Sequence, residues 1–201
     1  GNPNLKNIKI RTFIIIYLLS YLKKQAYKIV YCSKKSKMYH ENFGFYHKNS
    51  FVIENGYDEK KFFYNKNLNL KNRNKYSINK GAFILGIVAR FHPIKNHSFF
   101  FKIAFLLKKI LKKNLKIFII GKDINQNNKI LNEMINKYNL QKDVFLIEKT
   151  ESINAYYNTI DCLLLTSKDE SFPNVLCEAQ MTGLRCFSTD VGAAKEIINS
   201  D

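Results

Sequence analysis

Two positively charged side chains follow directly after an apolar segment in the middle of the chain. Ala82 to Ala89 has the composition of a buried strand, and Arg90 and Lys95 come after it, with Pro93 between them. Ligands of open α/β sheets bind beyond the carboxyl ends of the strands, so both cations can reach one anion there. Two fixed cations suit a diphosphate, although Lys95 can equally be an ordinary surface lysine.

Two carboxylates, Glu170 and Glu178, flank a predicted turn from a strand into a helix. If that helix begins at Pro173, its first free amides, from Asn174 onward, form an anion site together with the helix dipole. Glu178 can then accept hydrogen bonds from a ribose, and Glu170 can face the hydroxyls of a sugar. The spacing alone fits an exposed helical glutamate and a loop carboxylate equally well.

A third feature is Gly192, which stands between a predicted strand at 185–188 and a predicted helix at 193–198. A glycine there lets backbone approach a phosphate or a sugar closely, but alone this signal is weak. No pair of the four histidines has a convincing metal-ligand spacing, and no serine lies in a nucleophile elbow. We therefore expect no metal centre.

The charge of the chain does not by itself indicate a nucleic-acid binder. There are 33 Lys and Arg against 16 Asp and Glu, a formal charge of +17, but only four of the cations are Arg. Base readout and bidentate phosphate contacts favour Arg, so a solvated basic surface is the better interpretation and no nucleic-acid partner is expected. A basic face near anionic lipid stays open as an alternative.

Length and composition indicate a packed protein with one full domain, or one domain and part of another. The chain has 201 residues, 46% of them apolar, and its four cysteines lack zinc-ribbon or redox-pair spacing. The longest apolar run, Phe13 to Leu19, is too short to span a bilayer, and no cleavable signal is visible. These features predict a cytoplasmic protein.

Strand and helix patterns alternate along the chain, as in an α/β protein with a parallel sheet. Residues 65–80 are polar and rich in Asn and Lys, and we predict a loop or linker there. Ser33 is the predicted N-cap of a helix. Helices are expected at 10–27, 33–43, 98–113, 129–138, 153–158, 173–183 and 193–198, and strands at 28–32, 50–54, 82–89, 115–120, 144–147, 162–166 and 185–188.

Taken in order, several segments from about residue 52 to residue 201 resemble retaining glycosyltransferases of the GT-B fold, the family 4 group, also called glycosyl transferases group 1. One such motif would be weak evidence, but the ordered set is specific. The segments are Val52 to Asp58 with Phe62, Val88 to Phe91 with Lys95 to His97, the E-x7-E motif from Glu170 to Glu178, and Asp190 to Gly192 with Glu196.

The resemblance implies a Rossmann-like parallel sheet flanked by helices, with a partial second α/β unit at the N-terminus. Residues 1–54 would be the tail of an N-terminal acceptor-side domain, 55–80 a linker and entry segment, and 81–201 a donor-binding domain truncated at its C-terminus. Family members have two full domains, so the chain is expected to be a fragment that transfers little or no sugar by itself.

The resemblance also implies roles for single residues. Arg90 and Lys95 would hold the donor diphosphate, Glu178 would bind the ribose, and Glu170 would face the transferred sugar. Glu170, Arg90 and Lys95 would be the catalytic residues. The implied donor-binding set comprises Arg90, Lys95, Gly121, Phe172, Pro173, Asn174, Val175, Glu178 and Gly192.

The implied activity is that of a hexosyltransferase-type enzyme, which transfers a sugar with retention from a nucleotide-diphosphate sugar to a glycan or lipid-linked acceptor in bacterial surface polysaccharide synthesis. Cations and amides would take the place of a metal, so no cofactor is expected. A peripheral position at the inner face of the cytoplasmic membrane is compatible with this function. Two alternatives remain: a nucleotide-sugar epimerase of the same fold, and a non-catalytic module that binds polyanions or a membrane surface.

Overall fold

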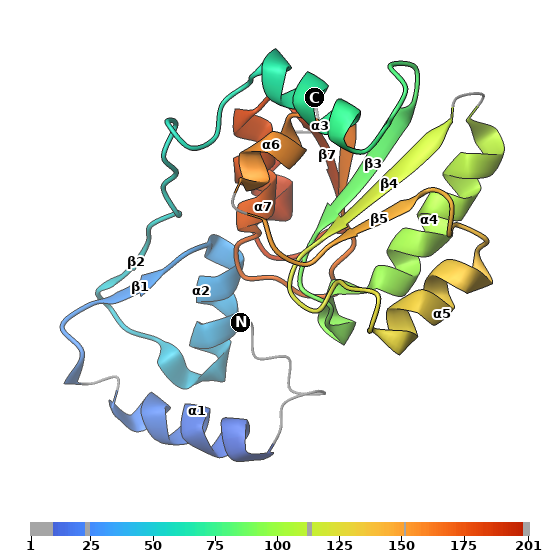
Figure 1. Cartoon of the computed structure of the whole chain (residues 1–201). Coiled ribbons are helices and arrows are strands. Elements are labelled where there is room, and N and C mark those ends of the chain that lie inside the picture. The colour runs from blue at the N-terminus through green and yellow to red at the C-terminus, as the bar shows by residue number, and fades with distance from the viewer. Residues whose placement is uncertain (1–9, 23–24, 112–113, 151, 199–201) are drawn as a thin grey trace. The chain divides into compact units, whose positions relative to one another are not determined.

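The computed structural model describes residues 10–22, 25–111, 114–150 and 152–198, and Figure 1 shows their helices and strands. The described residues form two compact units. Unit 1 takes its residues from 1–56, 169–174 and 190–201, and unit 2 takes its residues from 57–168 and 175–189. The chain therefore passes between the units several times.

Unit 1 contains a small parallel sheet of two strands, β1 (Ile29–Tyr31) and β2 (Ser50–Val52). As predicted, Ser33 caps the helix after β1: its Oγ accepts a hydrogen bond of 3.0 Å from the Ser36 backbone N–H. The helical elements of this unit are α1 (Ile10–Leu22), α2 (Lys34–His40), the π-helical turn η3 (Glu41–Phe45) and α8 (Ala194–Ile197).

Unit 2 is built on a parallel sheet of five strands in the order β5-β4-β3-β6-β7. The strands are β3 (Phe83–Val88), β4 (Leu115–Ile120), β5 (Val144–Ile147), β6 (Cys162–Leu165) and β7 (Arg185–Ser188). The sheet grows outward from β3 through β4 to β5, and then resumes on the other side of β3 with β6 and β7. This is the strand order of a doubly wound Rossmann-like fold.

Helices cover both faces of this sheet, as Figure 1 shows. They are α3 (Lys66–Lys75), the 3₁₀ turn η4 (Pro93–Lys95), α4 (His97–Ile110), α5 (Lys129–Lys137), α6 (Ile153–Tyr157) and α7 (Asn174–Met181). One face forms the main core, in which Leu85, Ile87, Ile117 and Ile119 pack with Phe100, Phe101, Ala104, Leu131 and Ile135 of α4 and α5. On the other face, Phe118 makes edge-on ring contacts with Tyr76 and Tyr156.

The structure confirms the predicted fold class, a parallel α/β sheet flanked by helices. The prediction of a loop or linker at residues 65–80 is wrong in part, because α3 occupies most of that segment. The Asn65 side chain starts the helix by accepting hydrogen bonds from the backbone N–H groups of Asn67 and Leu68. Asn has a low helix propensity and fills four of the ten positions of α3, so tertiary contacts decide this element.

Arg73 supplies the strongest of these contacts. Its side chain is buried, and it donates to the Asn79 carbonyl at 3.2 Å, the Ala82 carbonyl at 3.1 Å and Asp161 Oδ2 at 3.1 Å. The same Asp161 oxygen accepts from the Ile84 backbone N–H at 2.8 Å. One guanidinium therefore joins α3 to the start of β3 and to the residue before β6.

We predict that Arg73→Ala lowers the free energy of unfolding by about 3–5 kcal/mol, because it leaves the partly buried Asp161 carboxylate without its cation. The measurement is urea unfolding followed by circular dichroism. The control is Lys71→Ala in the same helix, where the side chain is exposed and the loss should stay within about 0.5 kcal/mol. Equal losses in the two variants would contradict this role of Arg73.

Candidate functional site

Arg90 lies at the carboxyl edge of the sheet in unit 2, where the chain leaves β3. The backbone there stays beside β4: Ala89 N–H donates to the Ile120 carbonyl and Phe91 N–H donates to the Lys122 carbonyl, both at 2.8 Å. Gly121 makes this possible. It has φ +147°, and a Cβ at this position would overlap the Ala89 carbonyl oxygen. Because Gly121 has no side chain, the backbone of Ala89 and Arg90 can pack directly against it.

Lys95 is fixed through its backbone to the end of β6. Thr166 Oγ1, directly after β6, donates to the Lys95 carbonyl at 3.0 Å, and Lys168 N–H donates to the Ile94 carbonyl at 2.7 Å. The loops after β3 and β6 therefore begin side by side. In a doubly wound sheet this is the switch point, where ligands bind. The segment with Arg90 and Lys95 thus lies at the edge that the sequence predicted.

His97 opens α4 immediately after this loop and is buried, with its ring 5.1 Å from that of Phe91. Neither ring nitrogen has a hydrogen-bond partner. Burial, together with the neighbouring Lys95 ammonium, lowers the pKa of His97 to about 4. The imidazole is therefore neutral at physiological pH and adds no third positive charge beside Lys95.

Glu178, in the second turn of α7, is held by a side chain that the sequence did not single out. Tyr157, at the end of α6, is almost fully buried. Its hydroxyl donates a hydrogen bond to Glu178 Oε2 at 2.7 Å. Burial, reinforced by the Glu178 charge, raises the pKa of Tyr157, so the hydroxyl stays a donor. Tyr157 therefore orients the carboxylate that the sequence predicts to bind ribose.

The segment from Glu170 to Asn174 belongs to unit 1, where neighbouring backbone and side chains hold it. Ser33 Oγ donates to the Ser171 carbonyl at 2.9 Å, and Asn55 Nδ2 donates to Asn174 Oδ1 at 2.7 Å. Gly192 has φ +52°, and a Cβ there would overlap the Glu170 carbonyl oxygen. Only glycine permits this approach to the Glu170 backbone, whereas the predicted approach of Gly192 to a phosphate or sugar stays a prediction.

The predicted site residues consequently fall into two groups. Unit 2 holds Arg90, Lys95, Gly121, Val175 and Glu178, and the first three share the edge at the end of β3 and β4. Unit 1 holds Glu170, Phe172, Pro173, Asn174 and Gly192, with Gly192 against the backbone of Glu170. Pro173 is buried, and α7 begins one residue after it. That all of these residues contact one donor stays a prediction.

Two cavities of unit 2 lie away from the switch point. One, of about 440 Å³, is at the opposite end of the strands and is lined by residues such as Arg73, Phe83 and Arg185. The other, of about 600 Å³, runs beside β5 and is rich in carboxamides, among them Asn125 and Gln141. Neither includes Arg90 or Glu178. Geometry at the switch point, and not cavity size, therefore indicates the site.

The part of the chain that the structure describes contains no group of three or more His, Cys, Asp or Glu side chains arranged to hold a metal ion. Burial raises the pKa of Cys162 to about 11 and that of Cys186 to about 12, so these thiols stay protonated near neutral pH.

These features define a class of protein: a Rossmann-like domain whose switch-point edge carries two cations. The family model "Glycosyl transferases group 1" matches residues 69–201, and the chain belongs to this family. HepE of Anabaena, solved in complex with UDP and glucose, superimposes with a TM-score of 0.84 over 99% of this chain and 53% of that one, at 19% identity. This likeness confirms the GT-B type of fold.

Two curated relatives are similar in sequence. An Escherichia coli enzyme, UDP-Gal:alpha-D-GlcNAc-diphosphoundecaprenol alpha-1,3-galactosyltransferase, is 27% identical over 153 residues, which is 75% of this chain and 39% of the relative. The amylovoran biosynthesis glycosyltransferase AmsD of Erwinia amylovora is 32% identical over 96 residues, 47% of this chain and 26% of the relative. The chain spans less than half the length of either relative.

We predict that the stability of unit 2 falls as the pH decreases from about 6.5 to about 4, because the unfolded chain protonates His97 while the folded protein does not. The loss should reach up to about 3 kcal/mol, at about 1.4 kcal/mol per pKa unit. Urea unfolding at several pH values measures it. His97→Leu should flatten the dependence, whereas His92→Leu, at an exposed ring, should keep it. Identical slopes for wild type and His97→Leu would refute the assignment.

Proposed function

We propose that this chain is the donor-binding part of a retaining glycosyltransferase, of the family 4 group, that uses a nucleotide-diphosphate sugar. The observation that carries the proposal is that hydrogen bonds from Thr166 and Lys168, just after β6, hold the backbone of the Arg90–Lys95 loop. These backbone contacts support the proposal because the loop that bears both cations begins at the edge of the sheet where ligands of this fold bind. The structures of HepE with UDP and with UDP-glucose support a nucleotide-sugar donor.

In the proposed complex, Arg90 and Lys95 hold the diphosphate, and the Glu178 carboxylate, oriented by Tyr157, accepts hydrogen bonds from the ribose hydroxyls. Glu170 faces the transferred sugar. Phe172, Pro173, Asn174 and Val175 shape the pocket at the start of α7, whose amides add positive potential. Gly121 and Gly192 let the backbone approach closely.

The proposed reaction breaks the bond between the sugar C1 and the diphosphate oxygen, and forms a bond from C1 to the acceptor hydroxyl oxygen on the same face. The hydroxyl proton passes to an oxygen of the leaving phosphate. Charge builds up on that phosphate as the bond breaks, and fixed cations stabilise this charge more in the transition state than in the ground state. We propose that these cations and the helix amides suffice without a metal ion.

The proposed acceptor is a glycan or a lipid-linked saccharide of a bacterial surface polysaccharide. The names of the Escherichia coli and Erwinia relatives, one with a diphosphoundecaprenol acceptor and one assigned to amylovoran biosynthesis, support this class. A hexose is the proposed sugar. A cytoplasmic position in contact with the inner face of the membrane would bring such an enzyme to a lipid-linked acceptor.

We predict that the chain binds UDP or GDP weakly and saturably, and by itself transfers little or no sugar. In isothermal titration, Arg90→Ala and Lys95→Ala should each weaken binding about ten- to a hundredfold, because each removes a charge-assisted contact to phosphate. Lys102→Ala, at an exposed position on α4, is the control and should leave binding unchanged. No saturable binding, or equal affinity in all variants, would count against the site.

Tyr157→Phe should weaken nucleotide binding about three- to tenfold, because Glu178 loses the hydrogen bond that orients it. The same titration measures this effect, and uridine diphosphate should be compared with inorganic pyrophosphate. Since pyrophosphate has no ribose, its affinity should be the same in wild type and Tyr157→Phe. A loss of equal size for both ligands would show that Tyr157 acts on the fold and not on ribose binding.

A further inference from the structure

A groove runs along β5, the outer strand of the sheet in unit 2. Its volume is about 600 Å³, within the range of about 300–1,000 Å³ that is typical of small-molecule sites. The residues that line it all come from the stretch of unit 2 between residues 76 and 148. We call this cavity the β5 groove. Its floor, its rim and its charge together indicate the class of ligand that it fits.

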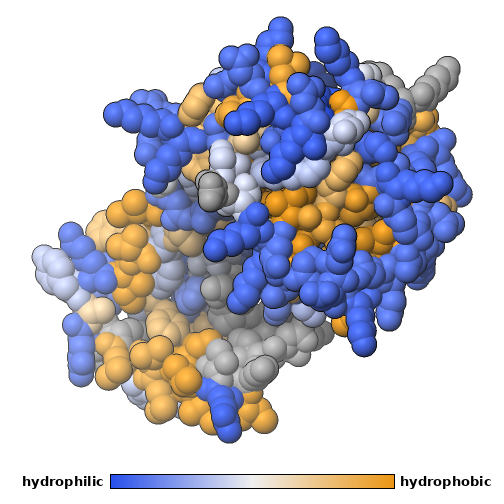
Figure 2. All heavy atoms as spheres, viewed as in Figure 1, coloured by the Kyte–Doolittle hydropathy of each residue, from blue (hydrophilic) through white to orange (hydrophobic). Residues whose placement is uncertain are grey.

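The floor of the β5 groove is apolar. It consists of two buried residues and three half-buried residues of β5, which are Ile124, Ile135, Val144, Phe145 and Leu146. The ring of Tyr76 also lines the groove, 5.2 Å from the ring of Phe145 and edge-on to it. Figure 2 shows hydrophobic residues over β5 with hydrophilic residues around them. Such a floor fits the C–H groups of a ligand.

The rim of the β5 groove carries carboxamide side chains that hydrogen bonds hold in place. Asn125 Nδ2 donates to Glu148 Oε1 at 2.6 Å, and Gln141 Nε2 donates to Asn136 Oδ1 at 2.9 Å. A third carboxamide, that of Asn132, donates to a backbone carbonyl at 2.6 Å. Because each carboxamide has two N–H donors and an oxygen with two lone pairs, one such bond leaves capacity for a ligand.

The backbone of β5 adds a further donor and a further acceptor. The carbonyls of Asp143 and Ile147 accept hydrogen bonds of 2.8 and 2.9 Å from N–H groups of β4 and of the residue after it, so they point toward β4. Backbone groups alternate in direction along a strand, so the N–H and C=O of Leu146 point to the outer edge of β5. A ligand in the groove therefore meets donors and acceptors close together.

The charge of the β5 groove differs from that of the chain as a whole. Among the described residues that line it there is no Lys or Arg, and Glu148 is the one charged side chain, although the chain contains 33 Lys and Arg. Lysines occur in the same segments outside the lining, at Lys129, Lys137, Lys142 and Lys149. A phosphate in the groove would lose water without gaining a cation, so the charge favours a neutral ligand.

We propose that the β5 groove binds a neutral saccharide. A hydroxyl group both donates and accepts hydrogen bonds, so the hydroxyls of a sugar match the carboxamides of the rim and the outer backbone edge of β5. The C–H groups of the sugar ring match the apolar floor. The lack of a cation in the described lining matches a ligand without a negative charge.

Other occupants match fewer of these features. An extended peptide would pair with the outer edge of β5 through its backbone and would not require carboxamides on the facing helix α5. A lipid acyl chain would cover the floor but would leave the donors and acceptors of the rim without partners. Over the described residues, no helix has both the length and the apolar character to cross a membrane.

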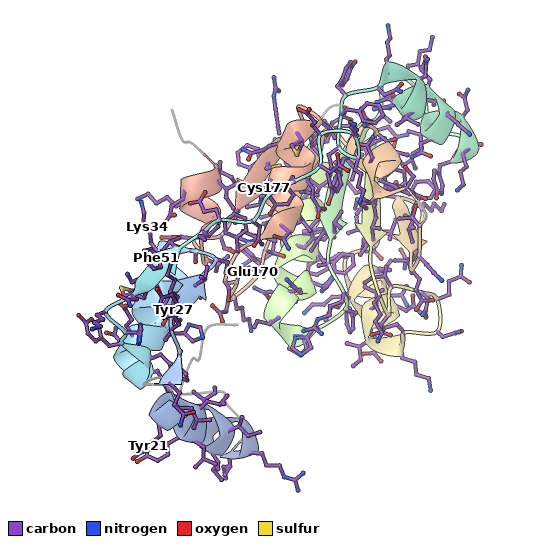
Figure 3. All side chains as sticks on the ribbon, turned by 90° about the vertical axis from the view of Figure 1, so that its left-hand side faces the viewer. Tyr21, Tyr27, Lys34, Phe51, Glu170 and Cys177 are labelled. Atoms are coloured by element: carbon purple, nitrogen blue, oxygen red, sulfur yellow. The ribbon has the colours of Figure 1, made fainter. Side chains whose placement is uncertain are left out.

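The lining of the β5 groove includes none of the residues predicted to bind the donor, among them Arg90 and Glu178. Figures 1 and 3 both show α5 well apart from α7, the helix that carries Glu178 and the labelled Cys177. The inference goes beyond the proposed function, because it gives unit 2 a second contact with a glycan and does not require a bound nucleotide. If the proposed enzyme extends a polysaccharide, the groove would hold part of that polysaccharide.

Side-chain amide resonances test the proposal directly. In NMR titrations with lactose, maltotriose and N,N′-diacetylchitobiose, at least one sugar should shift the NH₂ resonances of Asn125, Asn136 and Gln141 saturably. The resonance of Asn127, an exposed carboxamide outside the lining, should stay in place. No saturable shift of the rim resonances with any of these sugars would overturn the proposal.

Substitutions at the rim test which groups bind the sugar. Asn136→Ala and Gln141→Ala should each weaken sugar binding about three- to tenfold, because each removes hydrogen-bonding groups from the rim. Both side chains are exposed, so the fold should not change. The matched control is Asn127→Ala, which should bind the sugar as the wild type does. Equal affinity in all variants, or an equal loss in all of them, would contradict the proposal.

Salt distinguishes a neutral ligand from a charged one. Raising salt from about 0.1 M to about 1 M shortens the Debye length from about 10 Å to about 3 Å, so it should weaken UDP binding and change sugar affinity less than about twofold. A loss of sugar affinity as large as that of UDP would mean that charge governs binding to the groove, which contradicts the proposal.

Competition with UDP separates this inference from the proposed function. Arg90→Ala should lose affinity for UDP and keep its affinity for the sugar. Sugar binding by a chain that binds no UDP would support the β5 groove while the proposed function fails. If UDP displaces the sugar or shifts the same carboxamide resonances, the groove belongs to the donor site and the proposal is wrong.

A dilution series without sugar tests for the remaining occupant, a second copy of this chain. The Leu146 backbone N–H resonance should not change with protein concentration. A concentration-dependent shift at Leu146 would show that another copy pairs with the outer edge of β5, and the saccharide assignment would then be rejected.

Discussion

The pairing of β3 with β6 is the interaction on which the candidate site depends. Leu85 pairs with Cys162 and Gly86 with Leu163, although β4 and β5 lie between these strands in the sequence. Gly86 allows this packing, since a Cβ there would overlap the Ile160 side chain. Because the two strands are parallel neighbours, the loops that follow them start at the same edge. The hydroxyl of Thr166 and the amide of Lys168 then fix the loop that carries Arg90 and Lys95.

Most of this architecture could be predicted from the sequence, because the buried strands and helices of unit 2 have regular patterns of apolar residues. The run from Leu115 to Ile120 is apolar except for Lys116, as expected for a strand covered on both faces, and α4 shows an apolar face at helical spacing. Helix α3 was missed because its own residues are mostly Asn and Lys. Its position follows from Arg73 and Asp161, which lie 88 residues apart, and no local pattern reveals such a contact.

The candidate site shows the same division between local pattern and tertiary contact. Arg90, Lys95 and Gly121 could be found because they follow directly after strands. Tyr157 could not, because its hydrogen bond to Glu178 joins residues 21 apart across β6, and an aromatic residue on α6 looks like an ordinary core residue. His97 was recognised as part of the segment that resembles the family, but its depressed pKa could not be predicted, because the burial that causes it is not visible in the sequence.

Arg73 also has a bearing on how a lysine-rich sequence is interpreted. It donates to two carbonyls and one carboxylate through a planar fork, and an ammonium group cannot reproduce that directional set from one buried point. In a chain where lysine is the common cation, position 73 is thus one where the shape of the charged group counts as well as its charge. A lysine there would keep the charge but lose part of the link between α3, β3 and β6.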